Sequence, residues 1–259
     1  MSDNNKPVSR LCSFNADSVH YREHDLVNTL LDGRLDFVQI MAEHILGRRV
    51  TDAQGQVLHA VMIVLMEHGL SPGAIATRLV YMSAPEAMQS AVAAGLLAVG
   101  SQFVGTVENC ALLLEEISTA PKQEQIKVAE RIVARLHAGS QRVPGLGHHL
   151  HAPEDPRAQR LISLAGQLQM PGHHLHALRC LADAANDTSK RYLPVNATGA
   201  VAALLGEAQI PVRLMRGFAV VSRAAGLVAH VGEEQERPAG RYIWDTILDD
   251  LTPGRETDC

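Results

Sequence analysis

The chain has 259 residues, which is enough for one large domain or for two domains that share a cleft. Aromatic residues make up only 3% of it, and the many alanines, leucines and valines favour helix packing over sheet packing. The formal net charge of -5 provides no positive field for nucleic acid, and we find no apolar stretch of the roughly 20 residues that a membrane span requires. We therefore expect a helical protein that binds neither nucleic acid nor a membrane.

The cysteines and the N-terminal segment bear on the cellular compartment. Cys12, Cys110, Cys180 and Cys259 are scattered and form no CxxC pair, and the N-terminus lacks the charged-then-apolar pattern of a signal peptide. We expect reduced thiols and a cytoplasmic location. Residues 1–18 are polar and weakly periodic, which predicts a flexible tail.

Helical periodicity begins after this tail. Ser71 and Pro72 are typical of a helix start, and the small residues of Ala91–Ala98 predict a close contact between two helices. Only residues 192–195 have the character of a strand. We predict an all-α chain with helices over 35–46, 57–67, 72–82, 84–99, 108–117, 126–136, 158–167, 175–185, 199–207, 215–231 and 243–248.

A glycine-rich turn followed by a helix start is the first candidate functional segment. Pro144-Gly-Leu-Gly-His148 places a histidine on a bend where the backbone can approach a ligand closely. Arg157 follows Asp155-Pro156, which is typical of a helix N-terminus with Asp as the capping residue. A histidine on a turn and an arginine at a helix start suit a carboxylate or an acyl group. Alone, the segment would fit a polar loop before a helix better than a functional site.

Three further segments strengthen the functional interpretation. Glu67-His-Gly-Leu-Ser-Pro-Gly73 places His68 at a helix end, Leu193-Pro-Val-Asn-Ala-Thr-Gly199 precedes a helix, and Val221-Ser-Arg-Ala-Ala-Gly226 puts Arg223 among small residues. Taken singly, His68 could be a helix-terminal dipole partner, and Arg223 could pair with Glu233 or Glu234.

In this order, PGLGH, DPRA, PVN-x-x-G, SRAAG and GRYIWD resemble the citrate synthase superfamily, most closely its citryl-CoA lyase branch, which includes the C-terminal module of ATP-citrate lyase. The resemblance covers residues 21–251. It implies an all-α fold that works as a homodimer, with a large domain over 19–105 and 210–259 and a small domain over 106–209 on either side of a cleft.

The resemblance also implies roles for the residues that contact the substrate acid. His68 looks like the histidine that holds the keto or hydroxyl oxygen of the oxaloacetate part, and His148 like the one that handles the proton on that oxygen. Arg157 and Arg223 resemble the arginines that grip its carboxylates, for which a bidentate guanidinium is suited. Arg237 resembles an arginine that one subunit contributes to the active site of its neighbour in the dimer.

Coenzyme A is the cofactor that the resemblance implies, as part of an acyl-CoA substrate or product, and no metal is implied. Lys190 and Arg191 match basic residues that contact the phosphates of coenzyme A in the family. We expect Arg142 to add positive charge there, and Gly145 and Gly147 to let the backbone approach the cofactor. The other expected ligands are a di- or tricarboxylate or a 2-oxo acid.

Two positions depart from the synthase pattern. Phe103 stands where synthases carry a further histidine, which favours the lyase branch. Aligning Asn196 and Gly199 with the ends of the pattern Asn-Val-Asp-Gly leaves Ala197 and Thr198 between them with no carboxylate, and we take Ala197 as the residue in the place of the aspartate. Phe103, Asn196 and Ala197 are then expected to contact substrate. Loss of a proton-moving carboxylate costs on the order of 10²–10⁴ in rate.

Three interpretations follow for function. The chain is a citryl-CoA lyase-like enzyme that cleaves or forms a C–C bond in citryl-CoA or a related 3-hydroxy-3-carboxyacyl-CoA, giving an acetyl-CoA-type thioester and a 2-oxo acid. Alternatively, it keeps the pocket with a changed substrate, or it is a regulatory acyl-CoA-binding protein without turnover. Ester hydrolysis is weaker, because Ser101 and Ser222 lack a G-x-S-x-G elbow and Cys110 has no evident orienting partner.

Overall fold

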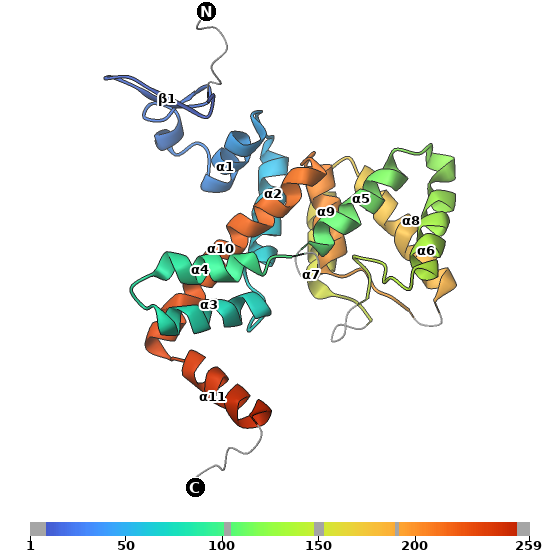
Figure 1. The fold of residues 1–259 in the computed structure, drawn as a ribbon. Coiled ribbons are helices and arrows are strands. Elements are labelled where there is room, and N and C mark those ends of the chain that lie inside the picture. Colours follow the sequence, from blue (N-terminus) through green and yellow to red (C-terminus); the bar gives the residue numbers. More distant parts are fainter. Residues whose placement is uncertain (1–8, 101–104, 148–152, 190–191, 253–259) are drawn as a thin grey trace, which may run out of the picture. The chain divides into compact units, whose positions relative to one another are not determined.

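A computed structural model describes residues 9–100, 105–147, 153–189 and 192–252 of the chain. These residues form helices α1 to α11 and one small sheet (Figure 1), which confirms the predicted all-α class. The chain divides into two compact units, Met1–His59 and Ala60–Cys259, and each is described by itself. The predicted domains at 19–105 with 210–259 and at 106–209 have different boundaries from these units and stay a prediction.

The first unit holds the sheet. Strands β1 (Cys12–Phe14), β2 (Val19–Tyr21) and β3 (His24–Asp25) pair antiparallel in that order, with Cys12 opposite Tyr21. The short 3₁₀ helix η1 (Leu30–Asp32), helix α1 (Phe37–Leu46) and the first half of α2 (Asp52–Met66) follow. No strand was predicted in this unit, and residues 1–18 were predicted to be a flexible tail. Strand β1 lies within that segment, so the tail prediction is wrong for residues 12–14. Strands of two or three residues are too short for apolar and polar residues to alternate visibly.

The second unit contains the remaining helices, and every predicted helix is confirmed. Most extend beyond the predicted ends, because terminal residues that face solvent add nothing to an apolar period. The helices are α3 (Pro72–Ser83), α4 (Met88–Leu97), α5 (Thr106–Ser118), α6 (Gln125–Ala138), α7 (Pro156–Gln167), α8 (His173–Thr188), α9 (Ala197–Glu207), α10 (Val212–Glu236) and α11 (Gly240–Leu251), with a 3₁₀ turn η2 (Lys122–Glu124).

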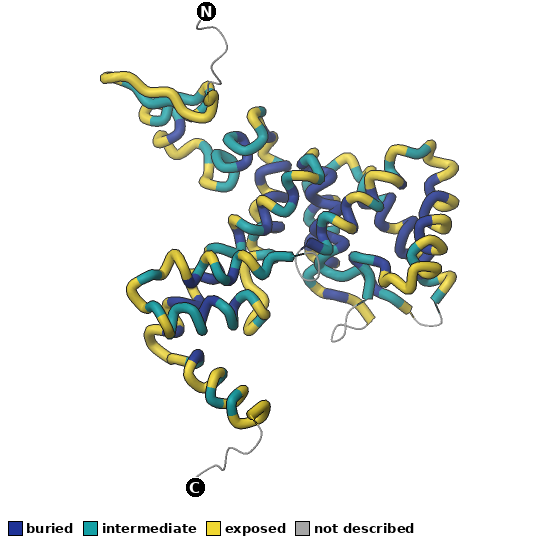
Figure 2. The backbone as a smooth tube through the Cα atoms, in the orientation of Figure 1, coloured by how far each residue is buried: buried dark blue, intermediate teal, exposed yellow. Residues whose placement is uncertain are grey.

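Helix α10 packs on α3, α4 and α5. Phe218, Leu227 and Val231 on this helix are buried. Figure 2 marks the buried residues of the described chain in dark blue. Contrary to the expectation from sequence, α10 has the length and hydropathy of a membrane span, the one such helix among those described. We attribute its apolar character to this packing, since a helix at the centre of a helical core is apolar over much of its surface.

Close approach between α3 and α4 confirms the contact predicted from small residues. A Cβ atom added to Gly95 would lie 2.1 Å from Thr77 Oγ1 and 2.8 Å from the Gly73 carbonyl oxygen. Only a residue without a side chain allows the two backbones to come so near. The contact holds the N-terminus of α3 beside the C-terminal half of α4.

Helices α5 to α9 pack on one another, with α9 against α5, α7 and α8. Every residue of α9 from Gly199 to Glu207 is buried, and this explains why its sequence has no polar face. The buried carboxylate of Glu207 accepts hydrogen bonds from the Gly172, His174 and Leu175 amides and so caps α8. The C-terminal end of α9 is thereby tied to the N-terminus of α8.

Candidate active site

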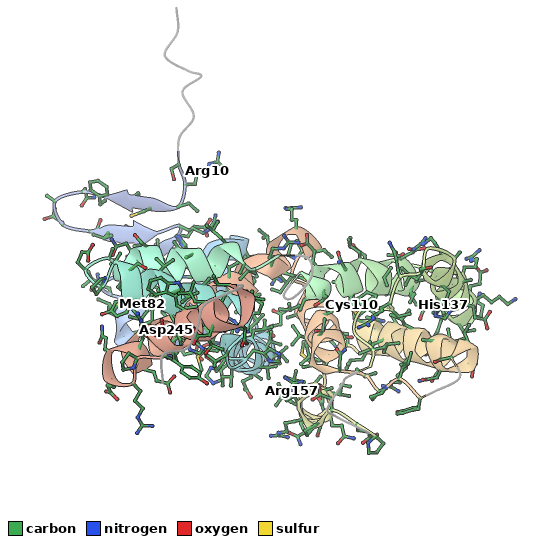
Figure 3. All side chains as sticks on the ribbon, turned by 60° about the horizontal axis from the view of Figure 1, so that its bottom comes forward. Arg10, Met82, Cys110, His137, Arg157 and Asp245 are labelled. Atoms are coloured by element: carbon green, nitrogen blue, oxygen red, sulfur yellow. The ribbon has the colours of Figure 1, made fainter. Side chains whose placement is uncertain are left out.

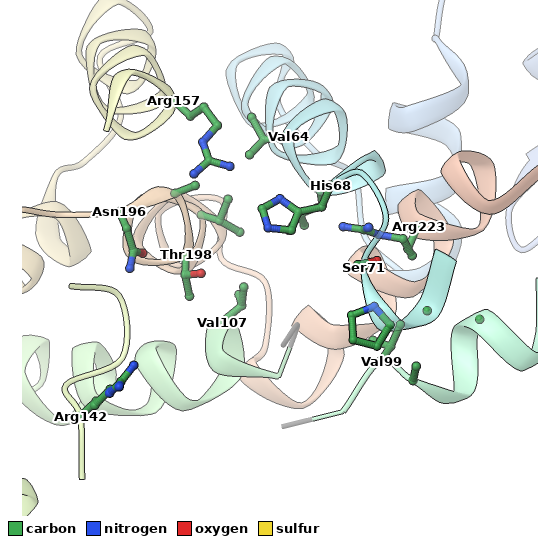
Figure 4. A pocket seen from close by; sticks show the side chains of 17 residues that line it. Val64, His68, Ser71, Val99, Val107, Arg142, Arg157, Asn196, Thr198 and Arg223 are labelled. Carbon is green, nitrogen blue, oxygen red and sulfur yellow. The ribbon is translucent and has the colours of Figure 1, made fainter. Parts of the chain in front are cut away.

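A cavity of about 470 Å³ lies within the second unit. Its walls come from the end of α2 and the turn after it, the start of α3, the end of α4, and parts of α5, α7, α9 and α10. Figure 4 shows His68 in the middle of the lining, with Arg157 on one side of it and Arg223 on the other. Residues as distant in sequence as Val64 and Arg223 therefore meet in one pocket.

The electrostatics of this cavity favour an anionic ligand. Arg142, Arg157 and Arg223 line it, and none of the described lining residues is an aspartate or a glutamate. The first turns of α3, α7 and α9 also reach it, through Pro72, Arg157 and Ala197. Helix N-termini carry partial positive charge, so they add to the attraction of a carboxylate.

Arg157 is held by a buried carboxylate on its own segment. Asp155 is fully buried and caps α7 by accepting from the Arg157 amide at 3.0 Å. The same carboxylate accepts from Arg157 Nε at 3.0 Å and Nη2 at 2.8 Å. Arg157, labelled in Figure 3, is thus oriented by two hydrogen bonds to its guanidinium. The predicted Asp cap is confirmed.

Asp155 also joins two of the walls, because its Oδ2 accepts from the Ala197 amide at the start of α9 at 3.0 Å. Burial would raise the pKa of Asp155, but hydrogen bonds from Arg157 and Ala197 outweigh it and lower the pKa to about 2. The carboxylate is therefore ionised throughout the physiological range. Arg157 and the N-terminus of α9 are fixed relative to each other by one charged group.

Arg223 reaches the cavity from α10 and is half-buried. Its Nε is buried without a hydrogen-bond partner among the described residues. Burial lowers the pKa of Arg223, and the charge of Glu67 acts in the opposite direction. Glu233 and Glu234 pair instead with Arg78, so the alternative that they neutralise Arg223 is wrong.

The glycine-rich turn before α7 packs directly against the segment before α9. Asn196 donates from its amide to the Gly145 carbonyl at 3.0 Å and from Nδ2 to the Gly147 carbonyl at 2.8 Å, and Gly147 donates to Pro194 at 2.7 Å. Gly145 and Gly147 have φ values of 89° and 75°, which favour glycine. Both glycines are thus required by the backbone, and their contact with coenzyme A stays a prediction.

Several predicted site residues are not placed in this cavity. His148, Phe103, Lys190 and Arg191 lie outside the described residues. Arg237 follows the end of α10, is exposed and does not line the cavity. Its assignment to a neighbouring subunit's site stays a prediction.

The structure adds lining residues that sequence reasoning passed over. Ser71 is the N-cap of α3, yet its side chain makes no capping hydrogen bond, and it lines the cavity. Thr198 lines the cavity from α9 (Figure 4). With Asn196 and Gly199 kept at the ends of the pattern Asn-Val-Asp-Gly, counting places Thr198, and not Ala197, at the third position. That count along the chain could have identified Thr198 without a structure.

Of the nucleophiles considered for ester hydrolysis, Ser101 lies outside the described residues, and Cys110 and Ser222 are poorly suited to it. Cys110 is fully buried on α5, and burial raises the pKa of its thiol to about 12, so the thiolate is scarce at neutral pH. Ser222 donates from its hydroxyl to the Met62 carbonyl oxygen. Among the described residues, no group of three or more His, Cys, Asp or Glu side chains is arranged to hold a metal ion.

Residues 7–244 match the family model for the C-terminal domain of citrate synthase, and the chain belongs to this family. The citryl-CoA lyase from Hydrogenobacter thermophilus has a similar structure, with 29% sequence identity, a TM-score of 0.79 and coverage of 90% of this chain and 88% of that one. The ATP citrate lyase from Methanothrix soehngenii, solved with citrate and coenzyme A, is similar in fold, at 18% identity and a TM-score of 0.77, over 91% of this chain and 40% of that one.

The chain is also similar in sequence to a curated relative. The probable ATP-citrate synthase subunit 1 of Neurospora crassa is 22% identical over 217 residues, which are 77% of this chain and 32% of that protein. The chain therefore spans about a third of that relative's length. The predicted resemblance is confirmed, and these relatives are enzymes of the citrate synthase and citryl-CoA lyase group.

Proposed function

We propose that the chain is a citryl-CoA lyase-like enzyme that cleaves or forms the C–C bond of citryl-CoA or a related 3-hydroxy-3-carboxyacyl-CoA, as a cytoplasmic homodimer. The observation that carries the proposal is the position of His68 between Arg157 and Arg223 in a cavity with no described carboxylate in its lining. This arrangement suits a 2-oxo dicarboxylate, whose carboxylates the two arginines bind and whose central oxygen His68 contacts.

Cleavage of citryl-CoA begins at its hydroxyl group. A base removes the hydroxyl proton, the new carbonyl forms as the C–C bond breaks, and the electron pair of that bond passes to the thioester as an enolate. Protonation of the enolate carbon gives acetyl-CoA and leaves oxaloacetate. His148 is the base that the family resemblance implies, while His68 stabilises charge on the central oxygen by hydrogen bonding.

The thioester product leaves as a coenzyme A ester. Arg142 lines the cavity apart from the two carboxylate-binding arginines (Figure 4), and it is the described residue that we assign to the coenzyme A side. Lys190 and Arg191 are proposed to bind the phosphates. A cationic side chain near the phosphates counteracts the distant net negative charge, because salt screens charges beyond roughly 8–10 Å.

Incubation with citryl-CoA tests the proposal directly. Mass spectrometry should detect acetyl-CoA and oxaloacetate in equal amounts, and His68→Ala should reduce their rate of formation at least about 100-fold. Related 3-hydroxy-3-carboxyacyl-CoA esters, offered in parallel, show whether the acid part differs from citrate. Absence of any product from these esters, with intact folding, would contradict the enzyme assignment.

A second candidate is a CoA-ester-binding protein without turnover. Thr198 favours it, because a hydroxyl stands where the family pattern has the carboxylate that moves a proton at the carbon next to the thioester. Calorimetry with citryl-CoA distinguishes the two candidates. Binding without product formation, in the wild type and in Thr198→Asp alike, would support the binding protein.

A further inference from the structure

The turn that carries His68 is built around one carboxylate. Glu67 Oε1 accepts from the His68 amide at 2.7 Å and from the Gly69 amide. Gly69 has a φ of 63°, and its carbonyl accepts from the Ser71 amide at 2.7 Å. The direction in which His68 leaves the backbone therefore depends on where the Glu67 carboxylate is held.

A histidine from α10 holds that carboxylate. His230 is buried, and its Nε2 lies 3.2 Å from Glu67 Oε1. Arg78 Nε donates to His230 Nδ1 at 3.1 Å. Since an N–H donates to an unprotonated nitrogen, the ring's proton lies on Nε2 and is donated to Glu67. The arginine thus selects the tautomer that the glutamate requires.

Arg78 is itself fixed by surrounding acids. It is 2% exposed, and its Nη1 donates to Glu234 at 2.8 Å while its Nη2 donates to Glu233. Glu234 is buried and also accepts from the Ala239 and Gly240 amides at the start of α11. The buried guanidinium of Arg78 donates a hydrogen bond from each of its three nitrogens, so it has little freedom to reorient.

We propose that Glu67 is a positioning residue for His68, and that His230, with its tautomer set by Arg78, holds Glu67 in place. The proposal rests on the proposed function, because it assumes that His68 contacts the central oxygen of the substrate. Neither Glu67 nor His230 lines the cavity. They fix the turn so that the His68 ring lies between the two carboxylate-binding arginines.

A small set of variants tests the proposal. Glu67→Ala removes the acceptor of both turn amides, and His230→Phe removes both ring nitrogens at similar size. His230→Gln restores an acceptor for Arg78 and a donor for Glu67. Glu236→Gln changes an exposed residue of α10 and serves as the control.

Kinetics on citryl-CoA give the first measurement. Glu67→Ala and His230→Phe should both lower kcat at least tenfold. His230→Phe, which leaves the charge of Glu67 beside Arg223, should keep KM within about twofold, His230→Gln should recover most of the loss, and Glu236→Gln should match the wild type. A rise in KM with unchanged kcat, or equal losses in His230→Phe and His230→Gln, would overturn the positioning role.

Nuclear magnetic resonance gives a second measurement that needs no turnover. At neutral pH, ¹⁵N spectra should show His230 protonated on Nε2 only, and hydrogen exchange at the His68 and Gly69 amides should be at least tenfold faster in Glu67→Ala and His230→Phe. Unchanged exchange in both variants would overturn the proposal even in an active enzyme. If the wild type turns over no ester, that result contradicts the proposed function. Amide exchange then still tests, by itself, whether Glu67 and His230 fix the turn.

Discussion

The two walls on either side of the cavity hold their polar side chains in different ways. On the α7–α9 wall, Asp155 and Arg157 are two residues apart, and their bonds are set by the start of one helix. On the α2–α3 wall, Glu67 depends on His230, which lies 163 residues further along the chain. The first wall is organised around the start of α7, with one further link from Asp155 to the Ala197 amide 42 residues away, whereas the second depends on a partner far along the chain. We therefore expect substitutions in the α7–α9 wall to change mainly the stability of the fold. Substitutions in the α2–α3 wall should change mainly the position of His68.

The largest expected effect on stability is at Asp155. Asp155→Ala leaves the Ala197 amide and the Arg157 side chain without their shared acceptor and removes the cap of α7. We expect the free energy of unfolding to fall by about 2–4 kcal/mol, measured by chemical denaturation. Asp155→Asn keeps an acceptor and should lose less than Asp155→Ala. A loss below about 1 kcal/mol for Asp155→Ala would show that the α7–α9 wall does not rely on this carboxylate.

Acid should weaken the same wall. The pKa of Asp155 is lowered to about 2 in the folded chain, against roughly 3.9 when unfolded. A lowered folded-state pKa stabilises the fold above the unfolded value, and this contribution is lost as the pH falls from about 4 to 2. We expect the wild type to lose about 2 kcal/mol more than Asp155→Asn over this range in denaturant titrations. Parallel curves for the two proteins would contradict this.

Introducing a carboxylate at the start of α9 compares two neighbouring positions on one wall. Thr198→Asp restores the family pattern by count, so cleavage of citryl-CoA should rise about tenfold or more. Ala197→Asp, the substitution at the position predicted from sequence, should give a smaller gain, because the new carboxylate would lie near the ionised Asp155, which accepts from the Ala197 amide. Steady-state rates of both variants check this order. The reverse order would restore Ala197 as the aspartate's equivalent.

The smallest expected effect is on coenzyme A binding. Arg142 is exposed, so Arg142→Ala should weaken binding of coenzyme A about threefold to fivefold and flatten its dependence on salt. Calorimetry at two salt concentrations measures both. Replacing Lys190 and Arg191 together by alanine should have an effect in the same direction. If the affinity for coenzyme A is unchanged in both the Arg142 variant and the Lys190 and Arg191 double variant, coenzyme A binds elsewhere.

The contrast between the walls also explains what could be predicted from sequence. The helices and the Asp155 cap depend on neighbours within a few residues, so periodicity and capping patterns revealed them. Short strands such as β1 carry too few residues for a pattern. The link from Glu67 through His230 to Arg78 joins segments more than 150 residues apart, and no local pattern contains it. His68 could be found by family resemblance, but the groups that hold it could not.

Binding of oxaloacetate to the two arginine variants tests the central claim most directly. If one dicarboxylate lies between the walls, Arg157→Ala and Arg223→Ala should each raise the dissociation constant at least about 30-fold in calorimetry, because each removes a charged, bidentate partner. Both proteins should stay folded, as circular dichroism would show. A dissociation constant unchanged in either variant would contradict the claim that the cavity holds the acid between Arg157 and Arg223.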